Sequence, residues 1–232
     1  MSSIKIAIIG ECMIELSSQQ LDNTQTIKQS FGGDSMNTAI YLKKLAEDSV
    51  EVHYISSMGS DPLSTSLIKQ WQGYGINTDS ILINPEKHAG LYMIHNDASG
   101  ERTFQYWRND SAARYLVQHR DFHQTIEALK TFDAVYISGI SLAILPEHDC
   151  NILLINLEQL ASAGVKIIFD SNYRPALWSS KSHCQLFTNK IYAISSLALV
   201  TFDDENDLWA DNSIASCRDR LHREGVTELV IK

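Results

Sequence analysis

The chain has 232 residues, of which 44% are hydrophobic and 20% are charged, a balance typical of a globular protein. Its formal net charge of −9 argues against a broad basic surface, so we expect no nucleic-acid partner and no attraction to an anionic membrane. The cysteines are far apart in the sequence, which indicates neither a zinc motif nor a disulfide framework; they are Cys12, Cys150, Cys184 and Cys217. We expect reduced thiols and a cytoplasmic protein.

Short apolar runs rich in β-branched residues alternate with helical patterns along the chain. The runs cover residues 4–9, 52–56, 134–138, 165–170, 198–202 and 228–232. The helical patterns cover about 34–47, 61–73, 147–162, 183–194 and 214–224. This alternation predicts an α/β fold with a mostly parallel sheet covered by helices on both faces. We find no linker and expect one domain over residues 1–232; the first apolar run is too short to span a bilayer.

Two adjacent glycines and an acid stand directly before the first helical pattern, in the segment Phe31-Gly32-Gly33-Asp34-Ser35-Met36-Asn37. Glycine lacks a Cβ atom, so its backbone can adopt a positive φ and a ligand can lie against it. Asp34 or Ser35 is suited to cap the helix, and Asn37 in its first turn can donate and accept. The segment predicts a site for a polar small molecule. The alternative is an ordinary tight turn followed by an N-cap.

Residues 88–109 interrupt the alternation with two strand patterns around a turn at residues 97–100, where Gly100 suits a left-handed closing position. Since side chains alternate between the faces of a strand, one face of the second strand carries Phe104, Tyr106 and Arg108. Together with extended patterns at 12–17 and 25–31, the hairpin predicts a small antiparallel sheet, or lid, over the ligand edge. The alternative is a structural hairpin with one exposed arginine.

Polar residues also follow two of the later strands. The segment Asp170-Ser171-Asn172-Tyr173-Arg174-Pro175 offers a guanidinium whose planar fork matches carboxylate or phosphate oxygens, although it could be an ordinary loop. The acids at 203–205 could hold Mg²⁺ through its water shell, or simply start a solvated helix. His119 and His123 have no evident third ligand and suit a surface helix.

Taken together, these motifs resemble the ribokinase-like (PfkB) carbohydrate kinases, and within them the 2-keto-3-deoxygluconate kinases, over essentially the whole chain. The resemblance rests on these segments: 8–16 (IIGECMIEL), the Gly-Gly-Asp-x-x-Asn-Thr-Ala helix start, Gly90-Leu91-Tyr92, 100–104 (GERTF), Tyr106-Trp107-Arg108, 138–142 (SGISL), 170–178 (DSNYRPALW) and Asp203-Asp204-Glu205.

The resemblance implies an α/β/α sandwich with a β-sheet lid that often serves in dimerisation, so it implies a homodimer or higher oligomer. It implies transfer of the γ-phosphoryl group of Mg·ATP to the 6-hydroxyl of a sugar acid. By resemblance, the substrate would lie against Gly33, Asp34, Ser35, Met36, Asn37, Tyr92, Tyr106, Trp107, Arg108 and Arg174. ATP would lie near Asn172, Tyr173 and Arg174, and Mg²⁺ near Asp203, Asp204 and Glu205.

Two features depart from the family pattern. The metal-side motif often reads Asn-x-x-Glu, whereas here Asp203 and Asn206 stand at those positions. The Gly-Asp motif, which supplies an anion hole and the catalytic base in the family, is missing: no two glycines are adjacent after position 100. We therefore expect a fold that lacks its C-terminal part and a catalytic base that lies beyond Lys232.

Other functions stay open at this point. A non-catalytic sugar-acid binder or partner subunit would keep the same binding residues. A fructokinase or nucleoside kinase would take a substrate without a carboxylate. A dinucleotide-binding oxidoreductase is disfavoured, because the first strand leads to Gly10-Glu11-Cys12 and not to a GxGxxG turn.

We predict that this chain alone shows no ATP-dependent phosphorylation of 2-keto-3-deoxygluconate. Phosphoryl transfer depends on positioning and on neutralising charge around the γ-phosphate, and the glycine turn expected to do so is missing. A coupled ADP-release assay with the purified chain measures this against a blank without enzyme. Turnover well above that blank would contradict the prediction.

Overall fold

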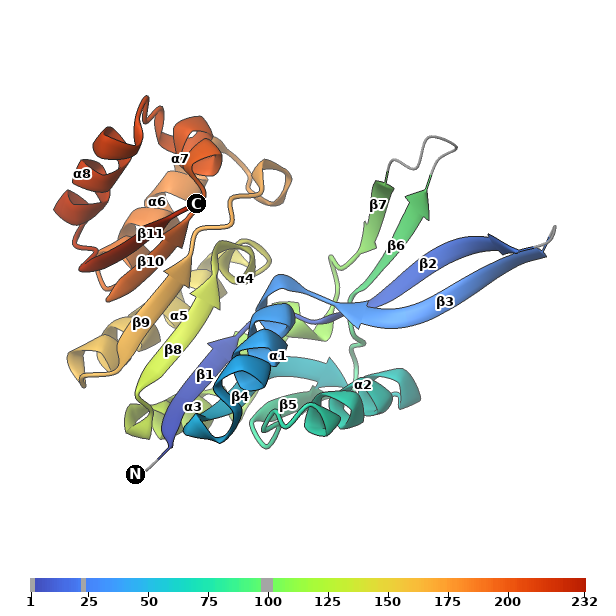
Figure 1. Cartoon of the computed structure of the whole chain (residues 1–232). Helices are drawn as coiled ribbons and strands as arrows, with labels where there is room; N and C mark the ends of the chain where they lie inside the picture. The colour runs from blue at the N-terminus through green and yellow to red at the C-terminus, as the bar shows by residue number, and fades with distance from the viewer. Residues whose placement is uncertain (1–2, 22–23, 97–101) are drawn as a thin grey trace.

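The computed structural model describes residues 3–21, 24–96 and 102–232. Within them, a seven-stranded parallel sheet runs in the order β11-β10-β9-β8-β1-β4-β5 (Figure 1). Its strands are β1 (Ile4–Ile9), β4 (Val50–Gly59), β5 (Ile81–Asn84), β8 (Ala134–Ser138), β9 (Lys166–Asp170), β10 (Leu197–Val200) and β11 (Glu228–Ile231). The mostly parallel sheet expected from the apolar runs is confirmed, and β5 is an additional edge strand.

Helices cover both faces of this sheet. They are α1 (Asp34–Ala46), α2 (Pro62–Gly73), α3 (Phe122–Ala128), α4 (Gly139–Ala143), α5 (Glu147–Ser162), α6 (Lys181–Tyr192), α7 (Phe202–Trp209) and α8 (Ile214–Glu224). In Figure 1, α1 lies in front of the sheet and α5 behind it. Short 3₁₀ turns complete the connections at η1 (Glu47–Ser49), η2 (Ala112–Gln118), η3 (Leu129–Thr131) and η4 (Pro175–Leu177).

The two-residue period of β1 divides the core between the two faces. Ile8 packs with residues of α1 and α2 on one face, while Ala7 and Ile9 pack with α3, α5 and α6 on the other. Ala7, Ile8 and Ile9 are buried on both faces of the sheet, which leaves no place for a polar residue in this half of β1, whereas Lys5 lies in its partly exposed first half. The three layers make the α/β/α sandwich expected from the sequence.

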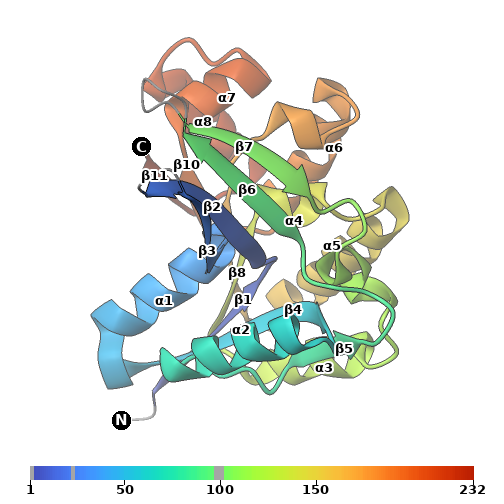
Figure 2. The ribbon, with the colours of Figure 1, turned by 90° about the vertical axis from the view of Figure 1, so that its right-hand side faces the viewer.

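A second, four-stranded sheet projects from the carboxyl edge of the central sheet, and Figure 2 looks onto it from that side. Its order is β3-β2-β6-β7, with β2 (Met13–Leu21), β3 (Thr24–Gly32), β6 (Leu91–Asn96) and β7 (Arg102–Trp107). The expectation of an antiparallel lid is wrong in one pair, because β2 and β6 are parallel. Both strands follow parallel strands of the central sheet and leave its edge in the same direction. The turn expected at 97–100, with Gly100, lies outside the described residues.

No helix among the described residues is both long and apolar enough to cross a membrane.

We predict that Asp61→Ala lowers the free energy of unfolding by about 0.5–2 kcal/mol. Asp61 caps α2 by accepting hydrogen bonds from the N–H groups of Leu63 and Ser64, each at 3.0 Å. Burial opposes ionisation, but the bonds from Ser64 and His88 outweigh it and bring the pKa of Asp61 to about 2. Its contribution is therefore complete above the ordinary value of 3.8 and is lost as pH falls towards 2.

Urea unfolding at pH 7 and at pH 2.5 measures this contribution. Asp121→Ala is the matched control, because Asp121 stands at the N-cap of α3 without a side-chain capping bond. Equal losses for the two variants at pH 7 would contradict the capping role of Asp61.

Candidate functional site

A cavity of about 290 Å³ lies where the central sheet meets the four-stranded sheet. The segments that follow β1, β3, β7 and β9 supply most of its lining, together with β6, β7 and α4. The lining residues are Glu11, Met13, Gly33, Asp34, Asn37, Tyr92, Phe104, Tyr106, Arg108, Ile140, Asn172 and Arg174. Parallel strands end at one edge of their sheet, so segments distant in the sequence meet there.

The glycine turn predicted from the sequence forms one wall of this cavity, but its geometry differs from the expectation. Gly33 is the N-cap of α1, and no side chain caps this helix, so the expected cap by Asp34 or Ser35 is wrong. Neither Gly32 nor Gly33 has a left-handed backbone. A Cβ atom at Gly33 would lie 2.5 Å from the carbonyl oxygen of Glu11, so close backbone approach requires glycine there.

Two residues of the predicted binding segment turn away from the cavity. Ser35 and Met36 are fully buried. The Ser35 hydroxyl lies 2.8 Å from the Tyr54 hydroxyl, and Met36 packs in the core between α1 and the sheet. The helix explains this, because successive residues point about 100° apart around its axis. The assignment of Ser35 and Met36 to the substrate is therefore corrected, while Asp34 and Asn37 do line the cavity.

The polar floor of the cavity joins α1 to the loop after β9. The Asn172 amide donates to the Asp34 carboxylate at 3.0 Å, and it lies 3.4 Å from the Ser138 hydroxyl. Asn172 has a positive φ of 34°, a conformation that asparagine tolerates better than most residues. The Asn37 side chain has no hydrogen-bond partner among the described residues and is exposed. Hydroxyl groups of a ligand would find both donors and acceptors here.

Below this floor, the Tyr136 hydroxyl donates to Asp170 at 3.1 Å. Burial raises the pKa of the Asp170 carboxyl above its ordinary value, although Lys232 and Tyr136 oppose that rise. Burial, with the nearby charge of Asp170, likewise raises the pKa of Tyr136. Tyr136 therefore stays a hydrogen-bond donor at neutral pH.

Aromatic rings from the four-stranded sheet form the opposite wall. Tyr92 pairs with Tyr106 across β6 and β7, with ring centroids 5.8 Å apart, and Phe104 stacks on Tyr106 at 6.3 Å. The alternation predicted for this strand is confirmed. The Tyr92 hydroxyl donates to Glu15, which also accepts from Ser30 at 2.7 Å, so Tyr92 presents its ring to the cavity. Trp107 does not line it and instead borders a surface cavity beside residues 86–89.

The two arginines expected at the site both line the cavity but differ in environment. The Arg108 side chain is 10% exposed and forms an ion pair with the Glu11 carboxylate, which is itself 2% exposed. The Arg174 side chain is 53% exposed, donates to the Tyr173 carbonyl at 2.9 Å, and lies 3.9 Å from Asp204. Arg108 is held firmly, whereas Arg174 has only weak partners.

Tyr173 itself is buried with Cys184 and Leu208, so its ring is not available to a nucleotide, and that assignment is corrected.

The three acids expected to hold Mg²⁺ point in different directions, because they are consecutive on α7. Asp203 is exposed, Asp204 faces Arg174, and Glu205 is fully buried. Glu205 accepts from the Tyr192 hydroxyl at 2.8 Å and from Arg220 at 2.6 Å. In this arrangement Glu205 cannot share a metal with its two neighbours, and that part of the prediction is wrong.

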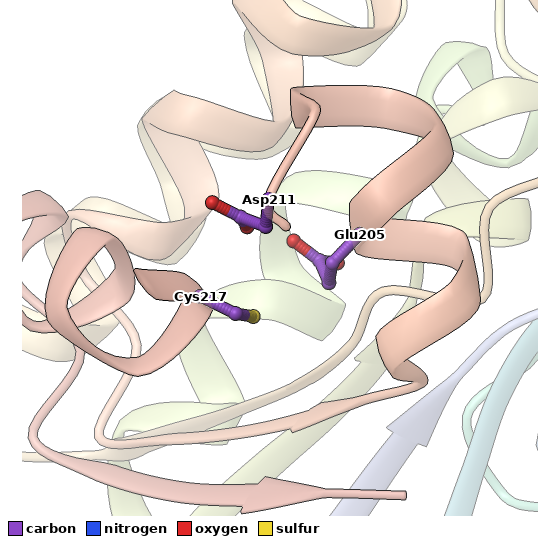
Figure 3. Close-up of side chains that lie close together, drawn as sticks. All are labelled: Glu205, Asp211 and Cys217. Carbon is purple, nitrogen blue, oxygen red and sulfur yellow. The ribbon is translucent and has the colours of Figure 1, made fainter. Parts of the chain in front are cut away.

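Figure 3 shows Glu205 beside Asp211 and Cys217, a grouping with donor atoms within 4.8 Å of one another. Its cation is already present, since the Arg220 guanidinium lies 2.7 Å from Asp211 as well as 2.6 Å from Glu205. Burial raises the pKa of Glu205. Burial works against the charge of Arg220, but its two carboxylate partners still hold its pKa above the ordinary value. This cluster is a structural ion pair and not a metal site.

Four lining residues were absent from the predicted site: Glu11, Met13, Phe104 and Ile140. Phe104 could have been included, because it shares a strand face with Tyr106. Glu11 lies just after a buried strand, a position that favours site residues, but its partner Arg108 is distant in the sequence.

The four-stranded sheet carries the exposed side chains Ile27, Phe104, Tyr106 and Trp107. Association of two copies through this sheet stays a prediction.

The chain has an α/β fold with a cavity at the carboxyl edge of its parallel sheet. The chain belongs to the pfkB family of carbohydrate kinases, whose model matches residues 3–232. Members of this family are phosphotransferases acting on sugar hydroxyls, which confirms the enzyme class predicted from the sequence.

Sequence relatives agree with this family. The chain is 47% identical to 2-dehydro-3-deoxygluconokinase of Haemophilus influenzae, over 98% of this chain and 72% of that protein. It is 43% identical to 2-dehydro-3-deoxygluconokinase of Dickeya dadantii, over 100% of this chain and 74% of that protein.

Solved structures share the fold at low sequence identity. A PfkB protein from Polaromonas sp. JS666 superposes with a TM-score of 0.86 at 20% identity, covering 100% of this chain and 76% of that one. A Xylella fastidiosa fructokinase solved with bound ATP has a TM-score of 0.80 at 20% identity, covering 98% of this chain and 68% of that one.

We predict that Arg220→Leu destabilises the chain by about 3–5 kcal/mol, because it leaves two buried carboxylates without a cation. Protonation removes the charge of a buried carboxylate whose pKa is raised. The loss in free energy of unfolding should therefore be smaller at pH 5 than at pH 8. Urea unfolding at both pH values measures it.

Arg218→Leu is the matched control for this prediction, since Arg218 is exposed and pairs only with its neighbour Asp219. A loss that does not depend on pH, or a fall in the unfolding midpoint on adding a metal chelator, would contradict this view of the Arg220 cluster.

Proposed function

We propose that the cavity is the sugar-acid site of an ATP-dependent kinase for 2-dehydro-3-deoxygluconate (2-keto-3-deoxygluconate), with the 6-hydroxyl as acceptor. The observation that supports this most is the presence of two arginines in a cavity of a chain with net charge −9. A sugar acid carries a carboxylate that a planar guanidinium binds through two hydrogen bonds. The relatives at 39–47% identity are named 2-dehydro-3-deoxygluconokinases, and their substrate has this carboxylate.

The rest of the cavity suits a short polyhydroxylated chain. Asp34 accepts hydrogen bonds from hydroxyl groups, and Asn37 can both donate and accept. The rings of Tyr92 and Tyr106 cover the less polar C–H faces of the ligand. A volume of about 290 Å³ is small for a ligand pocket and suits a six-carbon molecule better than a dinucleotide.

ATP supplies the γ-phosphoryl group in this proposal. Arg174 lies on the sheet edge next to Asn172, half exposed, and could neutralise phosphate oxygens as well as the sugar carboxylate. Of the three acids expected to hold Mg²⁺, Asp203 and Asp204 remain available for it, because Glu205 is engaged in the interior.

Calorimetry without ATP tests the sugar-acid site. We expect 2-dehydro-3-deoxygluconate to bind and fructose, a neutral sugar of similar size, to bind at least tenfold more weakly. Arg174→Ala should weaken binding of the acid about 10–100-fold, because a hydrogen bond to a charged group contributes about 1.5–3 kcal/mol. Binding of fructose should barely change.

Arg120→Ala is the control for this test, since Arg120 is an exposed arginine that does not line the cavity. Equal affinity of the wild-type chain for both sugars, or equal losses for both arginine variants, would contradict the proposal and favour a kinase for neutral sugars.

A further inference from the structure

Glu11 lines the cavity, but both oxygens of its carboxylate already have partners within the protein. Glu11 lies two residues after the end of β1, an interior strand of the central sheet, and its side chain is 2% exposed. Its two oxygens have different partners: Arg108 contacts Oε2, and the Ser111 hydroxyl donates to Oε1 at 2.5 Å. A carboxylate this deeply buried costs several kcal/mol unless it is paired, and Arg108 is its ionic partner.

The chain makes room for Glu11 with two glycines, one beside its carboxylate and one beside its backbone. A Cβ atom at Gly90 would lie 2.8 Å from Glu11 Oε1, and one at Gly33 would lie 2.5 Å from the Glu11 carbonyl oxygen. Both glycines belong to segments that border the cavity, before β6 and before α1. The backbone at Gly90 therefore packs against the Glu11 carboxylate and the backbone at Gly33 packs against the Glu11 main chain, and both contacts restrict the residue.

Arg108 is correspondingly fixed. Its side chain is 10% exposed, and its Nε–H is buried without a hydrogen-bond partner among the described residues. Buried donors are rarely left unpaired, so this N–H is a candidate to bind an acceptor on a ligand. Because Glu11 offsets the charge of Arg108, the pair contributes directed donors to the cavity but little net charge.

We propose that Glu11 is a positioning residue that holds the Arg108 guanidinium in the orientation needed to receive the carboxylate of the substrate. This inference rests on the proposed sugar-acid site. Glu11 acts through Arg108 and not by touching the ligand, and Ser111 fixes the second oxygen of Glu11. The placement of the acid group in the cavity thereby depends on the contacts of Glu11 behind the cavity wall.

A double-mutant cycle on ligand affinity tests the proposal, with 2-dehydro-3-deoxygluconate as the probe and circular dichroism to confirm folding. We expect Glu11→Ala and Arg108→Ala each to weaken binding at least tenfold. Adding Glu11→Ala to Arg108→Ala should change the affinity less than twofold, because the residue through which Glu11 acts is gone. Additive losses would overturn the proposal, as would wild-type affinity in Glu11→Ala.

Glu11→Gln serves as the second variant, since Glu11→Ala leaves the buried Arg108 without its charge partner and puts folding at risk. Glutamine can still accept from Arg108 while its amide donates to Ser111, so the orientation should persist and affinity should stay within threefold. A tenfold change in either direction would overturn the proposal; tighter binding would mean that Glu11 merely offsets charge. Glu51→Gln, at the opposite end of the sheet, is the charge-matched control and should leave the affinity unchanged.

A measurement without ligand separates this inference from the proposed function. In ¹⁵N NMR spectra, the Arg108 Nε–H proton should exchange slowly with solvent in the wild-type chain and in Glu11→Gln. Its exchange should be at least tenfold faster in Glu11→Ala. If Glu11→Ala does not fold, Ser111→Ala takes its place, with the same expected result. Unchanged exchange would overturn the positioning role. Failure of the wild-type chain to bind the sugar acid would instead reject the proposed function, and the exchange data would still show whether Glu11 holds Arg108.

Discussion

The buried ion pair between Glu11 and Arg108 fixes how the two sheets of this protein meet. Glu11 lies two residues after the first strand of the central sheet, and Arg108 follows the last strand of the four-stranded sheet. Both side chains are at most 10% exposed, so separating them would leave two unpaired charges in the interior. Any displacement of the four-stranded sheet must therefore keep this contact or break it at a cost of several kcal/mol. The cavity lies at that junction, so its shape depends on the same contact.

The parallel arrangement of the central sheet explains why residues from so many segments reach one cavity. Every strand pair in that sheet is parallel, so the loops after β1, β8 and β9 emerge at one edge. The same constraint sets the unexpected parallel pair of the smaller sheet: β2 and β6 both start at this edge and run outward. Local sequence could not reveal that pairing, because each hairpin by itself is antiparallel and nothing in either one specifies how the two hairpins adjoin.

The sequence predicted elements better than side-chain directions. The strand at 134–138 and the helices at 147–162 and 214–224 were predicted with the observed bounds, because their apolar periods are unbroken. The edge strand β5 was missed, although it is as long as β10 and β11, which were predicted. The errors at the site arose where neighbouring residues in a motif were given one role: Ser35, Tyr173 and Glu205 turn inward while Asp34, Arg174 and Asp204 do not. Only the helix phase and the packing beneath it decide between them.

The two arginines of the cavity divide the recognition of an anion between them. Arg108 has a buried counter-charge, so its contribution comes from the fixed direction of its N–H groups. Arg174 has a side chain 53% exposed and a distant partner in Asp204, so it brings net charge but is screened by water until a ligand covers it. A neutral sugar has no charge to pair with Arg174, so covering this side chain would not strengthen its binding. In the proposed site, the exposed arginine would therefore supply most of the discrimination between a sugar acid and a neutral sugar, whereas the buried one would determine where in the cavity the acid group must lie.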